Sequence, residues 1–237
     1  MLLWHQYIKV CMQGVEYMLK RAIPIFLLFI FVLSSFITVP AIAASKDVSE
    51  YDDVTVMKIM NNTQVTDLKA KGAILMDVNT GKVLLEQNSD EKLPIASVTK
   101  IMSMLLVMEA IDMGKLNYDD KVTVSEHSYS MGGSQVWLEP GEVFTVDELL
   151  KAVAIHSAND ATVALGEAVA GSEEAFVSMM NDKARELGMN NTNFLDCTGL
   201  TDKGHYSTAR DIAIMSRELL LKYPQITNYT TIWHAQF

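Results

Sequence analysis

The alternation of apolar and polar residues near position 71 predicts that the folded part of the chain begins with a β-hairpin. Two short apolar runs, 73–78 and 82–86, flank the segment Asn79-Thr80-Gly81. A glycine in this position can supply the positive φ that a tight turn between antiparallel strands requires. Residues 44–70 are polar and mixed, and they indicate only a lead-in to this hairpin.

After residue 100 the pattern changes to helical spacing. Residues 101–113 are almost wholly apolar, which predicts a helix buried on all sides, with Gly114 as its stop. Short β-like pieces and loops are expected over 121–144. Capping boxes, helical spacing and terminal glycine or proline residues predict further helices over 145–155, 161–170, 176–187 and 208–223. A single hairpin beside so many helices is marginal as a sheet on its own.

The N-terminal residues predict export by a signal peptide over residues 1–43. Two basic residues precede an apolar run that closes on the small-residue pattern Ala41-Ile42-Ala43. A retained transmembrane anchor is the alternative, although a proline and two serines interrupt the run. Met18 is the expected translation start, because Met18-Leu19-Lys20-Arg21 alone has the ordinary form of a charged leader. We therefore expect the mature chain at the extracytoplasmic face of the membrane or cell wall, or secreted.

The composition is that of a globular protein with a substantial core. The chain has 237 residues, of which 49% are hydrophobic, and a net charge of −10. This acidic balance argues against nucleic acid and anionic membranes as partners, because both attract basic patches. Cys11 precedes the expected cleavage site, so Cys197 is left without an intramolecular disulfide partner. We interpret Cys197 as a structural or incidental thiol, with a catalytic role as the weaker alternative.

The first candidate for chemistry is Ser97-Val98-Thr99-Lys100, at the start of the long apolar helix. A lysine three residues after a serine lies on the same helical face, and the hydroxyl lies near the positive end of the helix dipole. An ammonium in an apolar helix is costly unless it has a partner or a function. The same spacing in Ser89-Asp90-Glu91-Lys92 is interpreted as a solvated loop, because no apolar helix follows it. A helix N-cap at Ser97 and a surface lysine at Lys100 remain the plain alternative.

The second candidate is Ser157-Ala158-Asn159, in the break between two predicted helices. A turn followed by a helix cap is the ordinary explanation of such a sequence. His156 stands next to Ser157, but adjacency in the sequence does not place it near Ser97. We interpret His156 as a bystander.

Together these segments resemble the penicillin-recognising serine enzymes, and within them the D-alanyl-D-alanine carboxypeptidases, the low-molecular-weight penicillin-binding proteins. The likeness extends from about residue 71 to about residue 223. It is carried by AILMDVNTGKVLLEQNSDEKLPIASVTKIM, SMGGSQVWLEPGE, LLKAVAIHSANDATVALGEAVAG and GLTDKGHYSTARDIAIMSREL. The resemblance implies an α/β (α+β) fold of the β-lactamase/transpeptidase type, with a helical subdomain and the N-terminal hairpin of an incomplete antiparallel sheet.

The resemblance also implies a role for each matching residue. Ser97 would be the nucleophile that attacks the D-Ala–D-Ala carbonyl of a peptidoglycan stem peptide, and Lys100 would be the base that takes its proton. Ser157 would help pass that proton to the departing D-alanine, and Asn159 would bind the substrate backbone and hold Lys100. The acyl-enzyme on Ser97 would then be hydrolysed, and β-lactams would acylate the same serine. No cofactor and no metal ion are expected.

The sequence departs from the family pattern because it contains no K-T-G or K-S-G. In the family, that strand supplies half of the oxyanion hole and a second cation that helps to lower the pKa of the lysine. Losing one oxyanion donor typically lowers the rate by about 10²–10³-fold. We therefore expect residues 71–237 to be a C-terminally truncated catalytic domain of impaired activity, without the membrane anchor with which the family's proteins end.

Two alternative functions stay open. A class A-like β-lactamase would need a deacylating glutamate on a loop after the Ser-x-Asn segment, whereas Glu167, Glu173 and Glu174 fall within or at the start of predicted helices. An exported non-catalytic remnant or binding module would keep the helical subdomain without turnover. Labelling by a fluorescent penicillin distinguishes a catalytic chain from such a remnant.

Overall fold

A computed structural model describes residues 68–201 and 203–234 of this chain. The chain divides into two compact units, and the helices and strands given below belong to the unit that contains residues 71–237. The predicted signal peptide and most of the predicted lead-in lie outside the described residues. Within the described ranges, no helix is long and apolar enough to cross a membrane.

The described part of this unit is mainly helical, with four short strands. The strands are β1 (Ala73–Met76), β2 (Val83–Gln87), β3 (Lys121–Thr123) and β4 (Val143–Thr145). The longer helices are α4 (Lys100–Asp112), α6 (Val146–Lys151), α7 (Asn159–Ala170), α8 (Glu173–Glu186) and α9 (Ala209–Lys222). Short helical segments are η2 (Ala96–Thr99), α5 (Glu126–Tyr129), η3 (Ala152–His156), η4 (Pro224–Ile226) and α10 (Thr227–Thr230).

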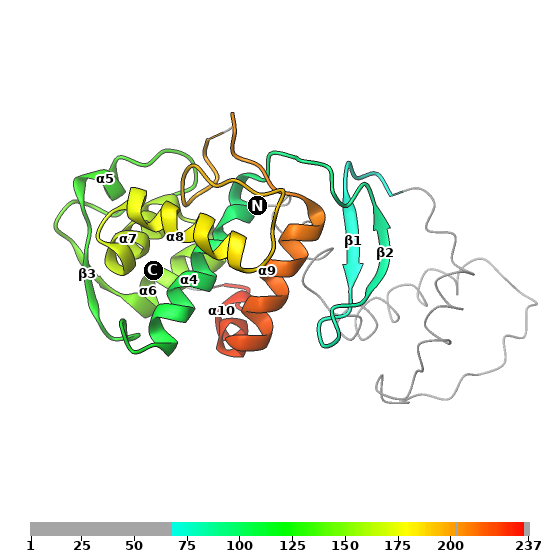
Figure 1. Ribbon diagram of the computed structural model, residues 1–237. Helices are drawn as coiled ribbons and strands as arrows, with labels where there is room; N and C mark the ends of the chain where they lie inside the picture. The colour runs from blue at the N-terminus through cyan, green and yellow to red at the C-terminus, as the bar shows by residue number, and fades with distance from the viewer. Residues whose placement is uncertain (1–67, 202, 235–237) are drawn as a thin grey trace, which may run out of the picture. The chain divides into compact units, whose positions relative to one another are not determined.

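The predicted β-hairpin is confirmed. Strands β1 and β2 pair antiparallel, and Gly81 in their turn has a φ of 73°. The carboxylate of Asp77 accepts hydrogen bonds from the backbone N–H and the hydroxyl of Thr80, which closes the turn. Arg217 of α9 donates to two backbone carbonyls of the same turn, so the hairpin is fastened to this helix (Figure 1).

Helix α4 forms the centre of the helical body, as its apolar sequence predicts. Of its 13 residues, 10 are buried, and these lie on every face of the helix. Helices α7, α8 and α9 pack around it (Figure 1). Each large apolar side chain buried in this way contributes about 1.5–3 kcal/mol. The N-terminal end of α4 is therefore held firmly inside the domain, which matters because that end carries the first candidate motif.

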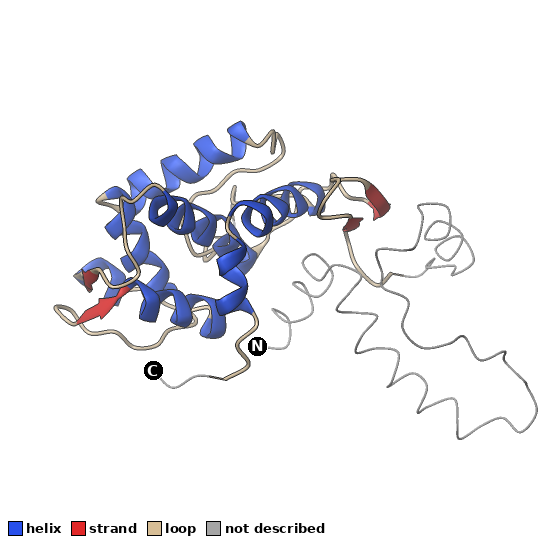
Figure 2. Cartoon of the chain, turned by 90° about the horizontal axis from the view of Figure 1, so that it is seen from below, coloured by secondary structure: helices blue, strands red, loops and turns tan. Residues whose placement is uncertain are grey.

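A second two-stranded sheet corrects the expectation of a single hairpin. Strands β3 and β4 pair antiparallel, with Val122 opposite Phe144. The two views place this sheet at the other end of the helical body from the β1–β2 hairpin (Figures 1 and 2). Short β-like pieces were predicted over 121–144, but strands of three residues are too short for the sequence pattern to show that they pair into a sheet.

Helix α6 begins at the predicted capping box. The Thr145 hydroxyl accepts from the Glu148 backbone N–H at 3.1 Å, and the Glu148 carboxylate accepts from the Thr145 N–H at 2.7 Å. The predicted continuation to Ile155 is not α-helical, because η3 is a π-helix that ends at Ser157 with a left-handed φ of 58°. Single π turns of this kind are frequent at functional sites.

The remaining predicted helices are confirmed with small shifts at their ends. Helix α7 begins at Asn159 rather than Ala161, and it ends before Gly171, whose φ is 88°. Helix α9 begins after Thr208, whose hydroxyl accepts from the backbone N–H of Asp211. Two short helical segments, η4 and α10, follow α9 in a stretch for which no element was predicted. These two segments are too short to give a helical repeat in the sequence.

Ser89 is buried, which corrects its interpretation as part of a solvated loop. Its side chain is 5% exposed, donates to the Glu86 carboxylate at 2.6 Å and accepts from Arg210 at 2.9 Å. Arg210 also pairs with the carboxylates of Glu86 and Asp90. The charged residues around Ser89 are exposed, as predicted, so the correction concerns Ser89 alone.

Candidate active site

Ser97 and Lys100 lie side by side where the chain enters α4. Ser97 belongs to the η2 turn, and Lys100 is the first residue of α4. The distance from Lys100 Nζ to Ser97 Oγ is 3.1 Å, which is within reach for proton transfer between them. Ala96 has a φ of 43°, a conformation that is uncommon for a residue with a side chain. The plain alternative was wrong, because Thr99 is the N-cap of α4 and Lys100 is fully buried.

The environment of Lys100 favours its neutral form. The side chain is 0% exposed, and Nζ donates to the backbone carbonyl of Thr198 at 2.8 Å as well as to Ser97. Burial lowers the pKa of Lys100 from 10.5 to about 8, against an opposing influence of Cys197 and Asp196. A lysine with such a pKa can serve as a base near neutral pH.

The Ser157-Ala158-Asn159 turn joins the π-helix η3 to α7. Ser157 Oγ is buried and has no hydrogen-bond partner among the described residues, and the same is true of Asn159 Oδ1. Asn159 Nδ2 donates to the carbonyl of Gly132 at 2.6 Å. The interpretation of this segment as a side-chain helix cap was wrong, because the N-cap of α7 is Ala158. The turn thus keeps two buried oxygens whose hydrogen-bonding capacity the described protein groups do not use.

Asn159 does not hold Lys100 directly, since the hydrogen bonds of Nζ go to Ser97 and Thr198. Gly133 lies next to Asn159 instead. A Cβ at this glycine would lie 2.8 Å from Asn159 Nδ2 and 3.5 Å from Leu200 Cδ1. Leu200 belongs to residues 196–201, a segment that we call the Asp196 loop. Gly133 is therefore close both to Asn159 and to this loop.

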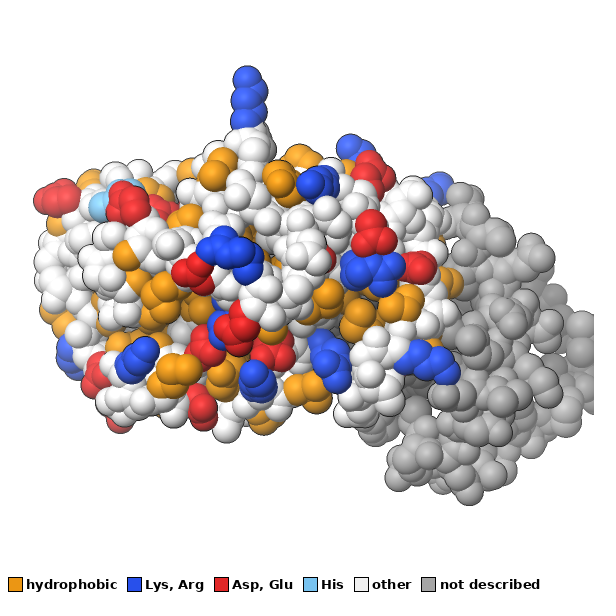
Figure 3. Space-filling view, in the orientation of Figure 1, with side chains coloured by type: hydrophobic (Ala, Val, Ile, Leu, Met, Phe, Trp, Pro, Cys, Tyr) orange, Lys and Arg blue, Asp and Glu red, His pale blue; other side chains and the backbone are white. Residues whose placement is uncertain are grey.

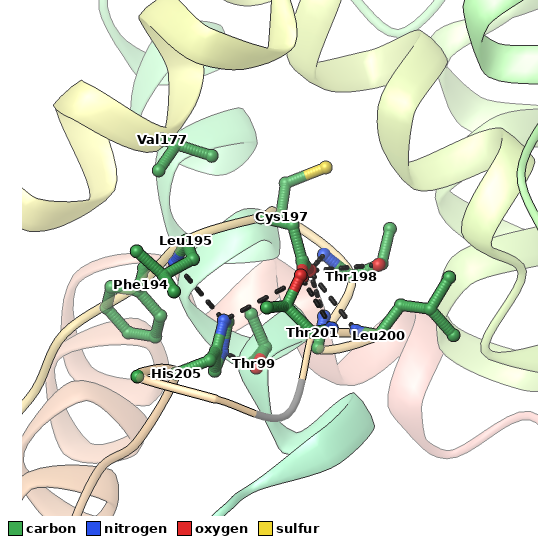
Figure 4. Close-up of polar contacts among 12 residues, drawn as sticks. Thr99, Val177, Phe194, Leu195, Cys197, Thr198, Leu200, Thr201 and His205 are labelled. Atoms are coloured by element: carbon green, nitrogen blue, oxygen red, sulfur yellow. Dashed lines mark hydrogen bonds and ion pairs between the residues drawn. The ribbon is translucent and has the colours of Figure 1, made fainter.

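The Asp196 loop is the part of the site that the sequence did not predict. One carboxylate, that of Asp196, accepts hydrogen bonds from the backbone N–H groups of Thr198, Gly199, Leu200 and Thr201 at 2.5–3.2 Å. Burial alone would raise the pKa of Asp196, but these hydrogen bonds outweigh it and hold the pKa well below its ordinary range. Figure 4 shows this loop curling beside Thr99. An aspartate followed closely by a glycine is a typical turn signal. It could have predicted a loop at these residues, but not that the loop lies beside the start of α4.

His205 connects the segment before this loop to the start of α4. Its Nδ1 accepts from the backbone N–H of Leu195 at 3.2 Å, so the neutral ring carries its proton on Nε2. Nε2 lies 2.7 Å from the hydroxyl of Thr99 and donates to it (Figure 4). Burial lowers the pKa of His205, against the opposing charge of Asp196, and so favours this neutral form.

The other residues singled out in the sequence lie around the site without joining it. His156 is exposed, and its backbone carbonyl accepts from the hydroxyl of Ser134. Burial raises the pKa of the Cys197 thiol well above its ordinary value, which supports a structural thiol. Glu167 lies on α7, and Glu173 and Glu174 lie at the start of α8. Within residues 68–201 and 203–234, no group of three or more histidine, cysteine or acidic side chains could hold a metal ion.

The charges on the face of the molecule in Figure 3 are mixed, with basic side chains next to acidic ones. Lys183 of α8 illustrates this mixing, because it pairs with Glu109 and Glu186 at 2.7 Å each. Charges of opposite sign that alternate in this way largely cancel at a distance. The causes of the lowered pKa of Lys100 are its burial and, in the opposite direction, its neighbours Cys197 and Asp196.

A family match, a curated relative and solved structures all relate this chain to the same group of proteins. Residues 59–237 match the family described as D-alanyl-D-alanine carboxypeptidase, peptidase S11. The chain is 59% identical over 162 residues to the D-alanyl-D-alanine carboxypeptidase DacF of Bacillus subtilis, covering 68% of this chain and 41% of that protein. It is similar to penicillin binding protein 6B from Escherichia coli, with a TM-score of 0.70 and 32% identity over 73% of this chain and 57% of that chain. It is also similar to ampicillin-bound Penicillin-Binding Protein D2 from Listeria monocytogenes, with a TM-score of 0.62 and 31% identity over 70% of this chain and 67% of that chain.

These neighbours confirm the fold class predicted from the sequence, that of the penicillin-binding proteins. The chain spans 41–42% of the length of DacF and of a second curated relative, DacC of Escherichia coli. The family match nevertheless covers most of this chain, including both candidate motifs. The chain belongs to the D-alanyl-D-alanine carboxypeptidase family, peptidase S11.

Proposed function

We propose that this chain carries the acylation site of a serine-type D-alanyl-D-alanine carboxypeptidase, with Ser97 as nucleophile and Lys100 as base. The observation that supports this assignment most strongly is the 3.1 Å contact between Ser97 Oγ and a fully buried lysine amine. Burial lowers the pKa of that amine to about 8, so an appreciable fraction is neutral near pH 7. Membership of the family supports a peptidoglycan stem peptide ending in D-Ala–D-Ala as the substrate.

The proposed reaction proceeds through an ester on Ser97. As Ser97 Oγ attacks the carbonyl carbon of the penultimate D-alanine, neutral Lys100 takes the hydroxyl proton. The tetrahedral intermediate collapses, the peptide C–N bond breaks, and the departing D-alanine nitrogen receives a proton. Water then attacks the ester carbonyl and gives up a proton to Lys100, which releases the shortened peptide and restores the Ser97 hydroxyl.

Ser157 and Asn159 are proposed to interact with the leaving group and with the substrate backbone. Ser157 Oγ passes the proton from Lys100 to the departing amine, and Asn159 Oδ1 accepts a hydrogen bond from the substrate backbone. The support for both roles is that these two buried oxygens have no hydrogen-bond partner among the described residues. Leaving such a group unpaired costs about 1–3 kcal/mol, which a bound substrate would offset.

The same chemistry predicts that β-lactams acylate Ser97, and the ampicillin-bound form of the Listeria relative supports this expectation. A β-lactamase is less well supported. The Glu167 carboxylate accepts from Ser125 at 2.7 Å, and the Glu173 carboxylate accepts from the Cys197 N–H at 3.1 Å, so both are engaged in structural contacts. The predicted signal peptide would place the reaction outside the cytoplasm, where peptidoglycan is found.

The test is covalent labelling of the purified full chain by a fluorescent penicillin, read by gel fluorescence and by intact mass. Labelling is expected to disappear in Ser97→Ala and to survive in Ser89→Ala. Ser89 is a matched control, because it begins the other Ser-x-x-Lys. Peptide mapping should locate the adduct on Ser97. A folded wild-type chain that takes no label would overturn the catalytic assignment and favour a non-catalytic binding module.

A further inference from the structure

We propose that Asp196 is a positioning residue for the Ser97–Lys100 pair, because its carboxylate shapes the loop whose Thr198 carbonyl holds Lys100 Nζ. The inference rests on the function proposed above and adds to it a residue that does not touch the substrate. The evidence comes from the hydrogen bonds of the loop, from its fit against the Ser97 turn and from the charge of the carboxylate.

The hydrogen bonds of Asp196 determine which way the loop presents its carbonyls. Its Oδ1 accepts from the N–H groups of Thr198, Gly199 and Leu200 and from the Thr198 hydroxyl, and its Oδ2 accepts from the Thr201 N–H. When successive N–H groups converge on one anion, the carbonyls of the same residues point away from it. The Thr198 carbonyl turned outward in this way is the one that accepts from Lys100 Nζ at 2.8 Å.

The loop also fits against the turn that carries the nucleophile. A Cβ at Gly199 would lie 1.8 Å from the Ala96 carbonyl oxygen and 2.8 Å from Thr99 Oγ1. On the other side, the Cys197 carbonyl accepts from the Ser103 hydroxyl of α4 at 2.6 Å. Backbone contacts on both sides leave the loop little freedom to move. The position of Lys100 Nζ relative to Ser97 therefore depends on the fold that Asp196 imposes on the loop.

The charge of Asp196 acts on Lys100 as well. Cys197 and Asp196 raise the pKa of Lys100 and so limit the fall that burial causes. Of these two groups, Asp196 is the one that carries a negative charge. Burial raises the pKa of the Cys197 thiol and keeps it protonated, and burial favours the neutral form of His205. Glu173 acts on Cys197, to whose N–H it is bonded.

The variant that separates charge from shape is Asp196→Asn. Asparagine keeps an oxygen for the donors on Oδ1 but removes the negative charge and the acceptor for the Thr201 N–H. The pKa of Lys100 should fall, because an opposite charge that favoured the ammonium is lost. The direct measurement is an NMR pH titration of the chain labelled with ¹³C at lysine Cε. The acid limb of penicillin acylation should move to lower pH by the same amount.

Two further variants complete the test. Asp196→Ala removes the loop's acceptor altogether, so its acylation rate should fall well below that of Asp196→Asn, which should restore part of the rate. Asp211→Asn is the matched control. Asp211 is a buried carboxylate that, like Asp196, accepts from a loop, at Asn191 and Thr192, and its loss should leave the Lys100 titration unchanged.

An unshifted Lys100 titration in folded Asp196→Asn would overturn the proposal, as would a wild-type acylation rate and pH profile in Asp196→Ala. If Asp196→Ala does not fold, Asp196→Asn alone decides. The NMR titration needs no penicillin. A wild-type chain that takes no label, but whose Lys100 pKa falls in Asp196→Asn, would therefore refute the catalytic function and keep the coupling between Asp196 and Lys100.

Discussion

Lys100 places a pH-dependent cost on folding that can be measured without any substrate. Its pKa is 10.5 in an unfolded chain and about 8 in the folded one. Between these two values the unfolded chain binds more protons at this site than the folded chain does, so the free energy of unfolding rises with pH. The cost is fully present below about pH 8 and fades as the pH approaches 10.5.

The size of the effect follows from the two pKa values. The difference between 10.5 and about 8 corresponds to about 3 kcal/mol at 1.36 kcal/mol for each unit. Lys100→Met removes the titrating group but keeps a long, unbranched side chain in the same space. The free energy of unfolding of the wild type, minus that of Lys100→Met, should rise by roughly 2–3 kcal/mol between pH 7 and pH 10. Methionine also leaves the Thr198 carbonyl unpaired, but that loss is the same at every pH.

The assay is urea unfolding followed by far-UV circular dichroism at pH 7, 8, 9 and 10 for both chains. Other groups also make the free energy of unfolding depend on pH, such as Tyr229, whose pKa burial and Asp147 raise above its ordinary value of 10.0, but these groups are common to both chains. Their contribution cancels in the difference. A second apolar variant, Lys100→Leu, should give the same dependence on pH. A difference that stays flat from pH 7 to pH 10 would refute the reasoning, because Lys100 would then keep its ordinary proton affinity inside the fold.

Other outcomes test the site and its support. With Lys100 as the base, the rate of acylation by a fluorescent penicillin, measured by stopped flow, should rise about tenfold from pH 7 to pH 9 and then level off. A rise of about a hundredfold over the same range would indicate that the pKa of Lys100 is near 10.5 instead. Gly199→Ala should abolish labelling and destabilise the fold by about 3 kcal/mol in thermal unfolding, since its Cβ would meet the Ala96 carbonyl; normal labelling would contradict this. Asp160→Ala should destabilise by about 3 kcal/mol in urea, because the buried N–H of Leu138 loses its acceptor; an unchanged midpoint would show that the contact is dispensable.

Much of the fold could be predicted because its signals are local. The hairpin turn, the apolar helix α4 and the capping box at Thr145 each depend on residues within a few positions of one another. The π-helix η3 could not be predicted, because its apolar residues also fit an α-helical pattern. Strands β3 and β4 are short and lie far apart in the sequence, so local patterns could not show that they pair with each other.

The site was predicted unevenly for the same reason. Ser97 and Lys100 are three residues apart, and the structure brings them into hydrogen-bonding contact. The carbonyl that holds Lys100 belongs to Thr198, 98 residues further along the chain. No local pattern can link positions so far apart, and a backbone carbonyl has no residue identity to recognise. The catalytic roles of Ser97, Lys100, Ser157 and Asn159 remain predictions.

The π-helix η3 also limits how the chain can vary in length. A π turn holds one more residue than an α turn, and one residue of an α-helix corresponds to about 100° of rotation about the axis. Deleting one residue from 152–156 would allow an unbroken α-helix, but it would rotate everything that follows and carry Asn159 away from Gly132. Loops elsewhere on the surface tolerate such changes. In this segment, the position of Asn159 is therefore encoded in the number of residues as much as in their identity.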